Sequence, residues 1–197
     1  MNPPIHPHKQ IWILRHAATE WSQNGRHTGR SDIPLLPEGE ETAKRMRPIV
    51  ESHTFELALS SPMKRAQRTA ELVGLGDAIE IDPDLREWDY GDYEGITTPE
   101  IRKTEPDWTI WDGKCPHGET GEDVAARARH VIDRALSVEG DVALFSHGHF
   151  SRVLAATWLH LSPDCGRFFT LDTGTMCVLG YEHEYRVIKT WNAKVHA

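Results

Sequence analysis

The chain changes from apolar to polar side chains at one point in the stretch Ile11-Trp12-Ile13-Leu14-Arg15-His16-Ala17-Ala18-Thr19-Glu20. The apolar run predicts a short buried strand. In an open α/β sheet, ligands bind beyond the carboxyl ends of the strands, so Arg15 and His16 would lie at a ligand-binding edge. Arginine supplies a fixed cation, and histidine is the commonest acid–base and nucleophilic ring. The alternative is a strand that ends in polar residues without a functional role.

A second boundary between a strand and a helix carries another arginine. Residues 56–60 predict a short strand, and Ser61-Pro62 predicts an N-cap followed by proline at the first helical position. Arg65 then falls in the first helical turn, where free backbone N–H groups and the helix dipole favour an anion. Because an arginine is unfavourable for the dipole there, its presence indicates a bound phosphate. A surface salt bridge with a nearby acid is the alternative.

A third boundary follows the near-continuous apolar run 142–146, which is typical of a central strand covered on both faces. The run ends at His147-Gly148, and a helix is predicted from about Phe150 to Leu159. His147 therefore repeats the placement of His16. His149 suggests a zinc site together with His147, but their spacing around a turn, with no cysteine or acid in register, argues against a metal.

Two further segments carry groups suited to a site. A polar loop predicted from Trp21 to Leu36 contains the hydroxyls of Ser22 and Thr28 and the cations Arg26 and Arg30. Ligand contacts concentrate in loops at strand ends, although an ordinary solvated loop is the alternative. Residues 84–95 are dense in acids and aromatic rings. A carboxylate among rings is partly desolvated, which raises its pKa and suits it to proton transfer, but composition does not say which carboxylate does this.

The remaining pattern predicts helices and strands with packing roles. One helix is opened by Pro37, and a long helix is capped by Thr120 with Asp123 as a loose capping box. Their packing faces are Ala43, Met46, Ile49 and Val50 in the first helix, and Val124, Ala128, Val131, Ile132 and Leu136 in the second. A short helix is predicted at 98–105 and strands at 79–81, 176–181 and 186–190. The histidines at 27, 53, 117, 130, 160, 183 and 196 are predicted to be surface or packing residues.

Composition limits the class of protein. The net charge of −8 argues against a general nucleic-acid or anionic-membrane binder, which would show a basic face. The three cysteines have no metal-like spacing, and together with a first segment that lacks an apolar signal region they favour a reduced, cytoplasmic setting. No stretch approaches the roughly 20 apolar residues of a membrane span. The 197 residues show no repeat or linker, so we expect a single domain over 1–197.

Five short blocks occur in a fixed order between residue 11 and about residue 150. They are Arg15–Trp21, Gly25–Leu35, Ser60–Ala70, Leu85–Gly95 and Ser146–Gly148. In this order they resemble the histidine phosphatase superfamily, also called phosphoglycerate-mutase-like, in the branch with a small cap. The resemblance implies an α/β three-layer sandwich with a mostly parallel central sheet and helices on both faces. It also implies a small cap insertion at about 97–119.

The resemblance implies a role for each matched residue. His16 would attack phosphorus and form a phosphohistidine, while Arg15, Arg65 and His147 would surround the phosphoryl oxygens. Glu87 would protonate the leaving oxygen and later take a proton from the attacking water. Ser22, Thr28 and Arg26 are expected to contact the phosphate or the rest of a small phosphorylated substrate. The resemblance implies neither a metal nor another cofactor, because arginines replace the usual Mg²⁺ clamp.

Ala17 departs from the family, which has glycine after the nucleophilic histidine. Glycine serves close backbone approach or a positive φ, so alanine would either be strained or crowd the pocket. A catalytically impaired phosphate-binding module is therefore one alternative to a phosphatase. Another is a phosphoglycerate mutase-type phosphotransferase. Such mutases carry Glu-Arg-His-Tyr-Gly where this chain has Glu87-Trp88-Asp89-Tyr90-Gly91, and the lost arginine and added acid favour a phosphatase.

The substrate itself is left open by the sequence. A sugar bisphosphate is one candidate, because Arg26, Arg30, Lys64 and Lys114 could bind a second phosphate. A homo-oligomer is possible, and neither nucleic acid nor membrane is expected as a partner.

Overall fold

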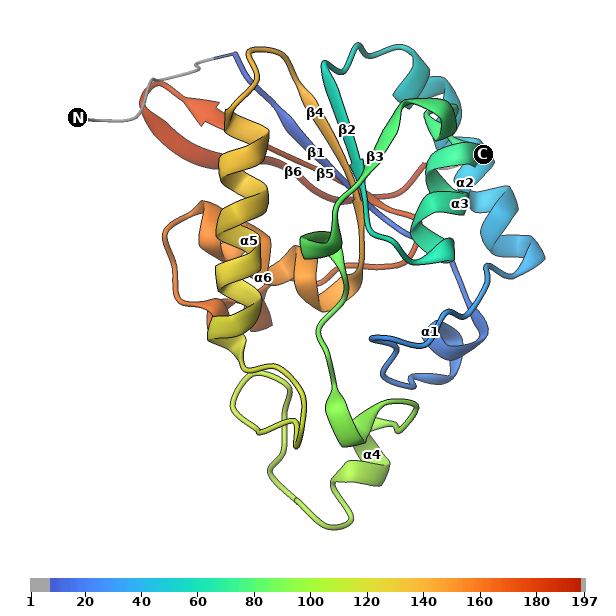
Figure 1. The fold of residues 1–197 in the computed structure, drawn as a ribbon, viewed down its shortest axis with the longest axis vertical. Helices are drawn as coiled ribbons and strands as arrows, with labels where there is room; N and C mark the ends of the chain where they lie inside the picture. Colours follow the sequence, from blue (N-terminus) through green and yellow to red (C-terminus); the bar gives the residue numbers. More distant parts are fainter. Residues whose placement is uncertain (1–7, 196–197) are drawn as a thin grey trace.

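A six-stranded sheet forms the centre of the computed structural model, which describes residues 8–195 (Figure 1). Its strands follow the order β3-β2-β4-β1-β5-β6. The first four in this order are parallel, whereas β5 pairs antiparallel to β1 and β6 pairs antiparallel to β5. The strands are β1 Ile11–Arg15, β2 Leu57–Ser60, β3 Ile79–Ile81, β4 Val142–Ser146, β5 Met176–Glu182 and β6 Tyr185–Ala193. The mostly parallel α/β sheet is therefore as predicted.

Helices cover both faces of this sheet (Figure 1). Successive strand residues point to opposite faces, so Ile13 and Leu144 pack in the core beneath α5 and α6, whereas Leu14 and Phe145 pack beneath α2 and α3. The helices are α2 Pro37–Glu51, α3 Lys64–Leu72, α5 Gly121–Leu136 and α6 Gly148–Trp158. Two separate cores on the two faces make a three-layer sandwich, which confirms the predicted fold class.

The carboxyl ends of β1, β2 and β4 lie level with one another. Arg15 pairs with Ser146 across β1 and β4, and Ser60 pairs with Phe145 across β2 and β4. The N–H of His16 continues this register by donating to the carbonyl of Ser146 at 3.0 Å. The residues that follow the three strands therefore meet at one edge of the sheet.

Helix α5 forms as its sequence predicts. The Thr120 hydroxyl accepts a hydrogen bond from the N–H of Asp123 at 3.3 Å, and the Asp123 carboxylate accepts one from the N–H of Thr120 at 2.9 Å. This reciprocal capping box satisfies two donors at the helix start. Val124, Val131 and the other predicted stripe residues are buried, except Leu136, which is partly buried.

Some local predictions are wrong in detail. Residues Glu20–Asn24 form a short helix α1, capped by Thr19, where a loop was expected. Helix α3 begins at Lys64 rather than directly after Ser61. The Ser61 hydroxyl accepts from the N–H of Met63, the residue before the helix, at 3.3 Å, and it also contacts the imidazole of His147 at 2.8 Å.

Two helical predictions also need correction. The helix α4 spans only Thr98–Ile101, whereas residues 98–105 were predicted. Ile49 of α2 is 37% exposed and lies outside the packing face formed by Ala43, Met46 and Val50.

Residues 97–119 lie beyond the carboxyl ends of the parallel strands, where Figure 1 shows them as an excursion that includes α4. The shorter 3-10 helices of the structure are Gly76–Ala78, Pro83–Leu85, Gly91–Tyr93 and Pro163–Phe168. No helix within residues 8–195 is both long and apolar enough to cross a membrane.

Candidate active site

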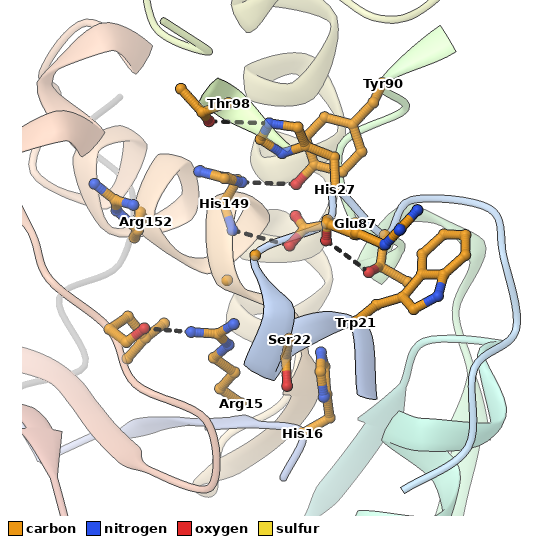
Figure 2. Close-up of a pocket in the computed structure, with 15 residues that line it drawn as sticks. Arg15, His16, Trp21, Ser22, His27, Glu87, Tyr90, Thr98, His149 and Arg152 are labelled. Carbon is orange, nitrogen blue, oxygen red and sulfur yellow. Dashed lines mark hydrogen bonds between the residues drawn. The ribbon is translucent and has the colours of Figure 1, made fainter. Parts of the chain in front are cut away.

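A pocket of about 280 Å³ opens at the carboxyl ends of β1 and β4 (Figure 2). It brings together six of the predicted site residues, Arg15, His16, Ser22, Arg26, Thr28 and Glu87. The other residues that line it are Trp21, Gly25, His27, Tyr90, Thr98, Gly148, His149, Arg152 and Leu171. The remaining two predicted residues, Arg65 and His147, do not line the pocket.

His16 is fixed in one tautomer. Its Nδ1 donates to the carbonyl of Ala17 at 2.8 Å, which leaves the lone pair on Nε2. The backbone around it is held on both sides, because its N–H donates to Ser146 and its carbonyl accepts from Gly174 at 3.1 Å. The ring is therefore positioned by β4 and by the segment that leads into β5.

The charge state of His16 suits a nucleophile. Burial lowers the pKa of its imidazole well below the ordinary value, and the positive charges of Arg65 and Arg15 lower the pKa further. The imidazole is therefore neutral near pH 7. A neutral ring with a free Nε2 lone pair is the form that can attack an electrophilic phosphorus atom.

Arg15 has a buried donor without a partner. Its Nη1 donates to the carbonyl of Leu171, whereas Nε is buried and has no hydrogen-bond partner. Within residues 8–195 it forms no ion pair with an acid. Gly148 allows its approach, since a Cβ there would lie 3.1 Å from Cζ of Arg15. A buried, unpaired cation costs free energy unless an anion binds beside it, so Arg15 is suited to hold one.

Glu87 lies at the amino end of α6. Its Oε1 accepts from the N–H groups of Trp88 at 2.9 Å and Phe150 at 2.8 Å, and its Oε2 accepts from the N–H of His149 at 3.0 Å. Figure 2 shows the carboxyl group in the wall of the same pocket as His16. These three donors fix the orientation of the carboxyl group from two different segments of the chain.

Arg127 of α5 holds the segment that carries Glu87. Its Nη1 donates to the carbonyls of Asp84 at 2.6 Å and Arg86 at 3.0 Å. Its Nε and Nη2 contact both carboxylate oxygens of Glu119, at 2.7 and 2.8 Å. A half-buried, bidentate pair of this kind positions a loop more firmly than an exposed pair does. Arg127 therefore supports Glu87 without lining the pocket.

Arg65 and His147 lie close to His16 and bind each other. Nε of Arg65 donates to Nδ1 of His147 at 3.2 Å, and the other Arg65 nitrogens donate to carbonyls of the loop at Thr28, Gly29 and Ser31. The His147 ring lies 5.1 Å from the His16 ring. Burial lowers the pKa of His147 well below its ordinary value, so this ring is also neutral near pH 7. The pair fixes the 28–31 loop and places positive charge near His16.

The three predicted substrate-contact residues differ in how free they are. Ser22 lines the pocket, but its hydroxyl donates to the Thr19 carbonyl at 2.8 Å and accepts from the Thr19 N–H at 2.9 Å. Thr28 donates to the carbonyl of Arg26 at 3.1 Å. Arg26 is exposed, and its Nη1 donates to the carbonyl of Gly95 at 2.8 Å. Each of the three side chains already has a hydrogen bond within the protein. A ligand would therefore be a second partner for it.

Comparison with known proteins assigns the chain to one family. A family model described as "Histidine phosphatase superfamily (branch 1)" matches residues 11–194. The chain belongs to this superfamily. The match includes all eight predicted site residues and nearly the whole described chain, and the predictions of the family and of a phosphatase within it are confirmed.

Two curated relatives and one solved structure of this histidine phosphatase family are similar over most of the chain. An acid phosphatase of Mycobacterium tuberculosis is 38% identical over 181 residues, covering 90% of this chain and 89% of its own. A sedoheptulose 1,7-bisphosphatase of Saccharomyces cerevisiae is 37% identical, covering 76% and 67%. A solved structure from a Mycobacterium tuberculosis open reading frame has a TM-score of 0.91 at 36% identity, covering 96% of this chain and 100% of that one.

The same pocket also contains residues that the sequence did not single out as ligand contacts. His27, predicted as a surface or packing residue, stacks on Tyr90 at 4.6 Å and lies 3.2 Å from the Thr98 hydroxyl through Nε2. His149 binds the Tyr90 hydroxyl through Nδ1 at 2.6 Å. Burial lowers the pKa of His27 to about 4 and the pKa of His149 well below its ordinary value. Both rings are therefore neutral hydrogen-bonding groups near pH 7.

Three of the cations suggested for a second phosphate lie outside the pocket. Arg30 is 79% exposed and pairs with Asp89, and Lys64 pairs with Asp32 at 3.8 Å. Lys114 also lies elsewhere, on the surface around Trp108. Only Arg26 of the suggested set lines the pocket, and Arg152 of α6, which the sequence did not single out, is a further cation there. Within residues 8–195 no cluster of three or more His, Cys, Asp or Glu side chains is arranged to hold a metal.

Ala17 is not strained. The non-glycine residues with positive φ in the described chain are His117, His160, His183 and Asn192, so Ala17 has a negative φ. Its side chain is fully buried in the core beneath α2 and α3 and does not line the pocket. The expectation of strain or of a crowded pocket is therefore wrong, because the methyl group points into the core.

We expect Ala17→Gly to change stability rather than activity. Removing a buried methyl group and adding backbone freedom should lower the free energy of unfolding by about 1 kcal/mol. Hydrolysis of p-nitrophenyl phosphate should stay within about threefold of the parent enzyme, because the alanine does not touch the pocket. Urea unfolding and steady-state kinetics measure the two effects. A gain of tenfold or more in kcat would show that alanine impairs the site.

Proposed function

We propose that this protein is a metal-independent phosphomonoester hydrolase that acts on a small phosphorylated metabolite through a phosphohistidine at His16. The observation that carries the proposal is that one pocket holds a neutral His16, free at Nε2, and Arg15, whose buried Nε has no hydrogen-bond partner. The similar acid phosphatase and sugar bisphosphatase support the choice of substrate class.

The proposed reaction has two phosphoryl transfers. In the first, Nε2 of His16 bonds to phosphorus as the bond to the leaving oxygen breaks, and Glu87 in its protonated form gives that oxygen a proton. In the second, water bonds to phosphorus as the bond to Nε2 breaks, and Glu87 takes up the proton of the water. Arg15 binds the phosphoryl oxygens, and the nearby positive charge of Arg65 stabilises them as well.

Hydrolysis is favoured over a mutase reaction by the residues after Glu87. Trp88 is 2% exposed and donates through its indole N–H to the Glu119 carbonyl at 2.9 Å, so this position supplies no cation to the pocket. Asp89 is paired with Arg30 outside the pocket. A mutase must retain its phosphorylated intermediate while the substrate reorients, and the side chains at these two positions add nothing that holds a second anion.

We expect the purified enzyme to release phosphate from p-nitrophenyl phosphate equally well with and without EDTA. The proposed chemistry uses only side chains, so a chelator should change kcat/KM by less than about twofold. Malachite-green detection of phosphate gives the rate. Loss of activity that added Zn²⁺ or Mg²⁺ restores would favour a metal hydrolase. No phosphate release in either buffer would favour a phosphate-binding module.

A further inference from the structure

Arg152 is a pocket residue that the proposed phosphoryl-transfer steps do not use. It lies on α6, one helical turn after Gly148 and His149, and lines the pocket with both of them. Figure 2 draws it well apart from His16, on the side of the pocket that holds His149 and Thr98. This side faces the part of a substrate that leaves, because phosphorus must lie against His16.

The Arg152 guanidinium is fixed in orientation. Its Cζ lies 4.5 Å over the ring of Trp111, and its Nε donates to the carbonyl of Gly166 at 3.0 Å. Glycine is needed there, since a Cβ at 166 would lie 2.6 Å from the Trp111 ring. Nη2 makes only a long contact of 3.5 Å to the Arg167 carbonyl, and Nη1 has no partner among residues 8–195. A pre-oriented fork with free donors suits recognition of a planar or tetrahedral anion.

The charges that line the pocket do not balance. Arg15, Arg26 and Arg152 are cationic, and Glu87 is the acid that lines the pocket with them. Within the described chain none of these three arginines pairs with a carboxylate, although the protein as a whole carries a net charge of −8. Burial lowers the pKa of Arg152 from its ordinary value, and Glu87 opposes that change, so desolvation is only partly compensated. A partly buried cation without a partner is stabilised by a bound anion.

Arg26 is a weaker candidate for the same task. It is exposed, and its Nη1 is used by the Gly95 carbonyl. Arg152 is less exposed than Arg26 and lies against a rigid stack, so it loses less side-chain entropy when it binds a ligand.

We propose that Arg152 binds a second anionic group, a phosphate or a carboxylate, on the leaving group of the substrate. The substrate class is then a small phosphomonoester with two separate anionic groups that fits a pocket of about 280 Å³. This inference rests on the proposed phosphatase function and names the part of the substrate that the pocket selects. Arg152 is a specificity residue in this scheme, and the phosphoryl transfer itself does not use it.

Matched substrate pairs test the proposal. Fructose 1,6-bisphosphate with fructose 6-phosphate differs by one phosphate, and 3-phosphoglycerate with glycerol 3-phosphate differs by one carboxylate. We expect the parent enzyme to prefer the doubly anionic member of at least one pair by tenfold or more in kcat/KM. Arg152→Met should reduce that preference about 10- to 100-fold, mainly through KM, because one charge-assisted contact is lost. The pair that responds identifies the anion.

The matched control is Arg186→Met. Arg186 stacks over Trp158 at the same 4.5 Å but does not line this pocket, so its replacement removes an arginine–tryptophan stack without touching substrate. It should leave the preference unchanged. Arg152→Lys keeps the charge without the fork and should restore part of the preference.

Three results would overturn the inference. They are a parent enzyme without preference in either pair, a preference that survives Arg152→Met, and an equal loss on all substrates including p-nitrophenyl phosphate. Failure of the proposed function differs from these, since the parent enzyme would then hydrolyse no phosphomonoester. Calorimetric binding in a His16→Ala background tests Arg152 even in that case, because Arg152→Met should weaken binding of the doubly anionic compound about tenfold or more.

Discussion

Replacement of His16 by alanine is expected to lower kcat for p-nitrophenyl phosphate by at least about 10³-fold. The imidazole supplies the nucleophile, because its Nε2 is free. Nε2 of His27 instead lies 3.2 Å from the Thr98 hydroxyl, and Nδ1 of His149 lies 2.6 Å from the Tyr90 hydroxyl. Water would have to attack phosphorus directly in the variant. Stopped assays of phosphate release at high enzyme concentration measure the residual rate.

The nucleophilic role of His16 also predicts a covalent intermediate. Acid-labile phosphate should appear on the parent enzyme after rapid quenching with labelled substrate and should be absent from His16→Ala. His130→Ala is the matched control, because His130 is exposed, contacts Asp84 at 3.3 Å and does not line the pocket. Retention of more than a tenth of the activity in His16→Ala, with the variant folded by circular dichroism, would contradict the proposed mechanism.

Replacement of Glu87 by glutamine is expected to lower kcat about 10²- to 10³-fold for alkyl phosphates. An alkoxide leaves only when it is protonated, whereas p-nitrophenolate leaves readily as an anion. The loss with p-nitrophenyl phosphate should therefore be about tenfold or less in the first transfer. The loss of kcat is measured with glycerol 3-phosphate and with p-nitrophenyl phosphate. A larger loss with glycerol 3-phosphate identifies Glu87 as the proton donor.

The Glu87 experiment needs a control for structure, because the carboxylate also accepts three backbone N–H groups. Glutamine replaces one accepting oxygen with a donor and weakens that hold on α6. Glu94→Gln is a matched control, since Glu94 accepts from the N–H groups of Gly29 and Ser31 at 2.9 Å but does not line the pocket. Equal losses for both substrate types in Glu87→Gln would show that its role is positional.

Much of the fold follows from local patterns in the sequence. The strand ends at Arg15 and Ser146 were predicted from apolar runs that stop abruptly, and parallel pairing then placed His16 at the edge of the sheet. The start of α5 was predicted from Thr120 and Asp123, because a capping box depends on residues only three apart. These features depend on short-range chemistry, which a single sequence records.

The outer half of the pocket could not be predicted in the same way. His27, His149 and Arg152 are ordinary in their local sequence and become pocket residues only because α6 packs near the loops that hold Tyr90 and Trp111. Long-range packing of this kind leaves no periodic pattern. One signal was available, since Arg152 follows His149 by three residues and three-residue spacing places both on one helix face.

Ala17 shows a different limit of sequence reasoning. A family position usually occupied by glycine suggests a positive φ. Whether alanine is tolerated there depends on where its Cβ points, and at Ala17 this is decided by the packing of α2 and α3. The engagement of Ser61 with His147 was hidden for the same reason, because the two residues are 86 positions apart.

Residues 97–119 lie beyond the strand ends, apart from the groups proposed to break the phosphate ester. Bond cleavage and selection of the metabolite are therefore assigned largely to different segments of the chain. The groups proposed to break the phosphate ester come from the end of β1, from α3 and from the segment that carries Glu87. Thr98, and Trp111 beneath Arg152, come from the excursion, whose Trp108 and Ile110 are buried in the core beneath α5 and α6. Insertions or exchanges there can retune which metabolite is accepted while the reaction centre is inherited intact. A fold organised in this way can diversify by swapping its excursion, so chimeras that exchange this segment between relatives offer a direct route to new substrate ranges.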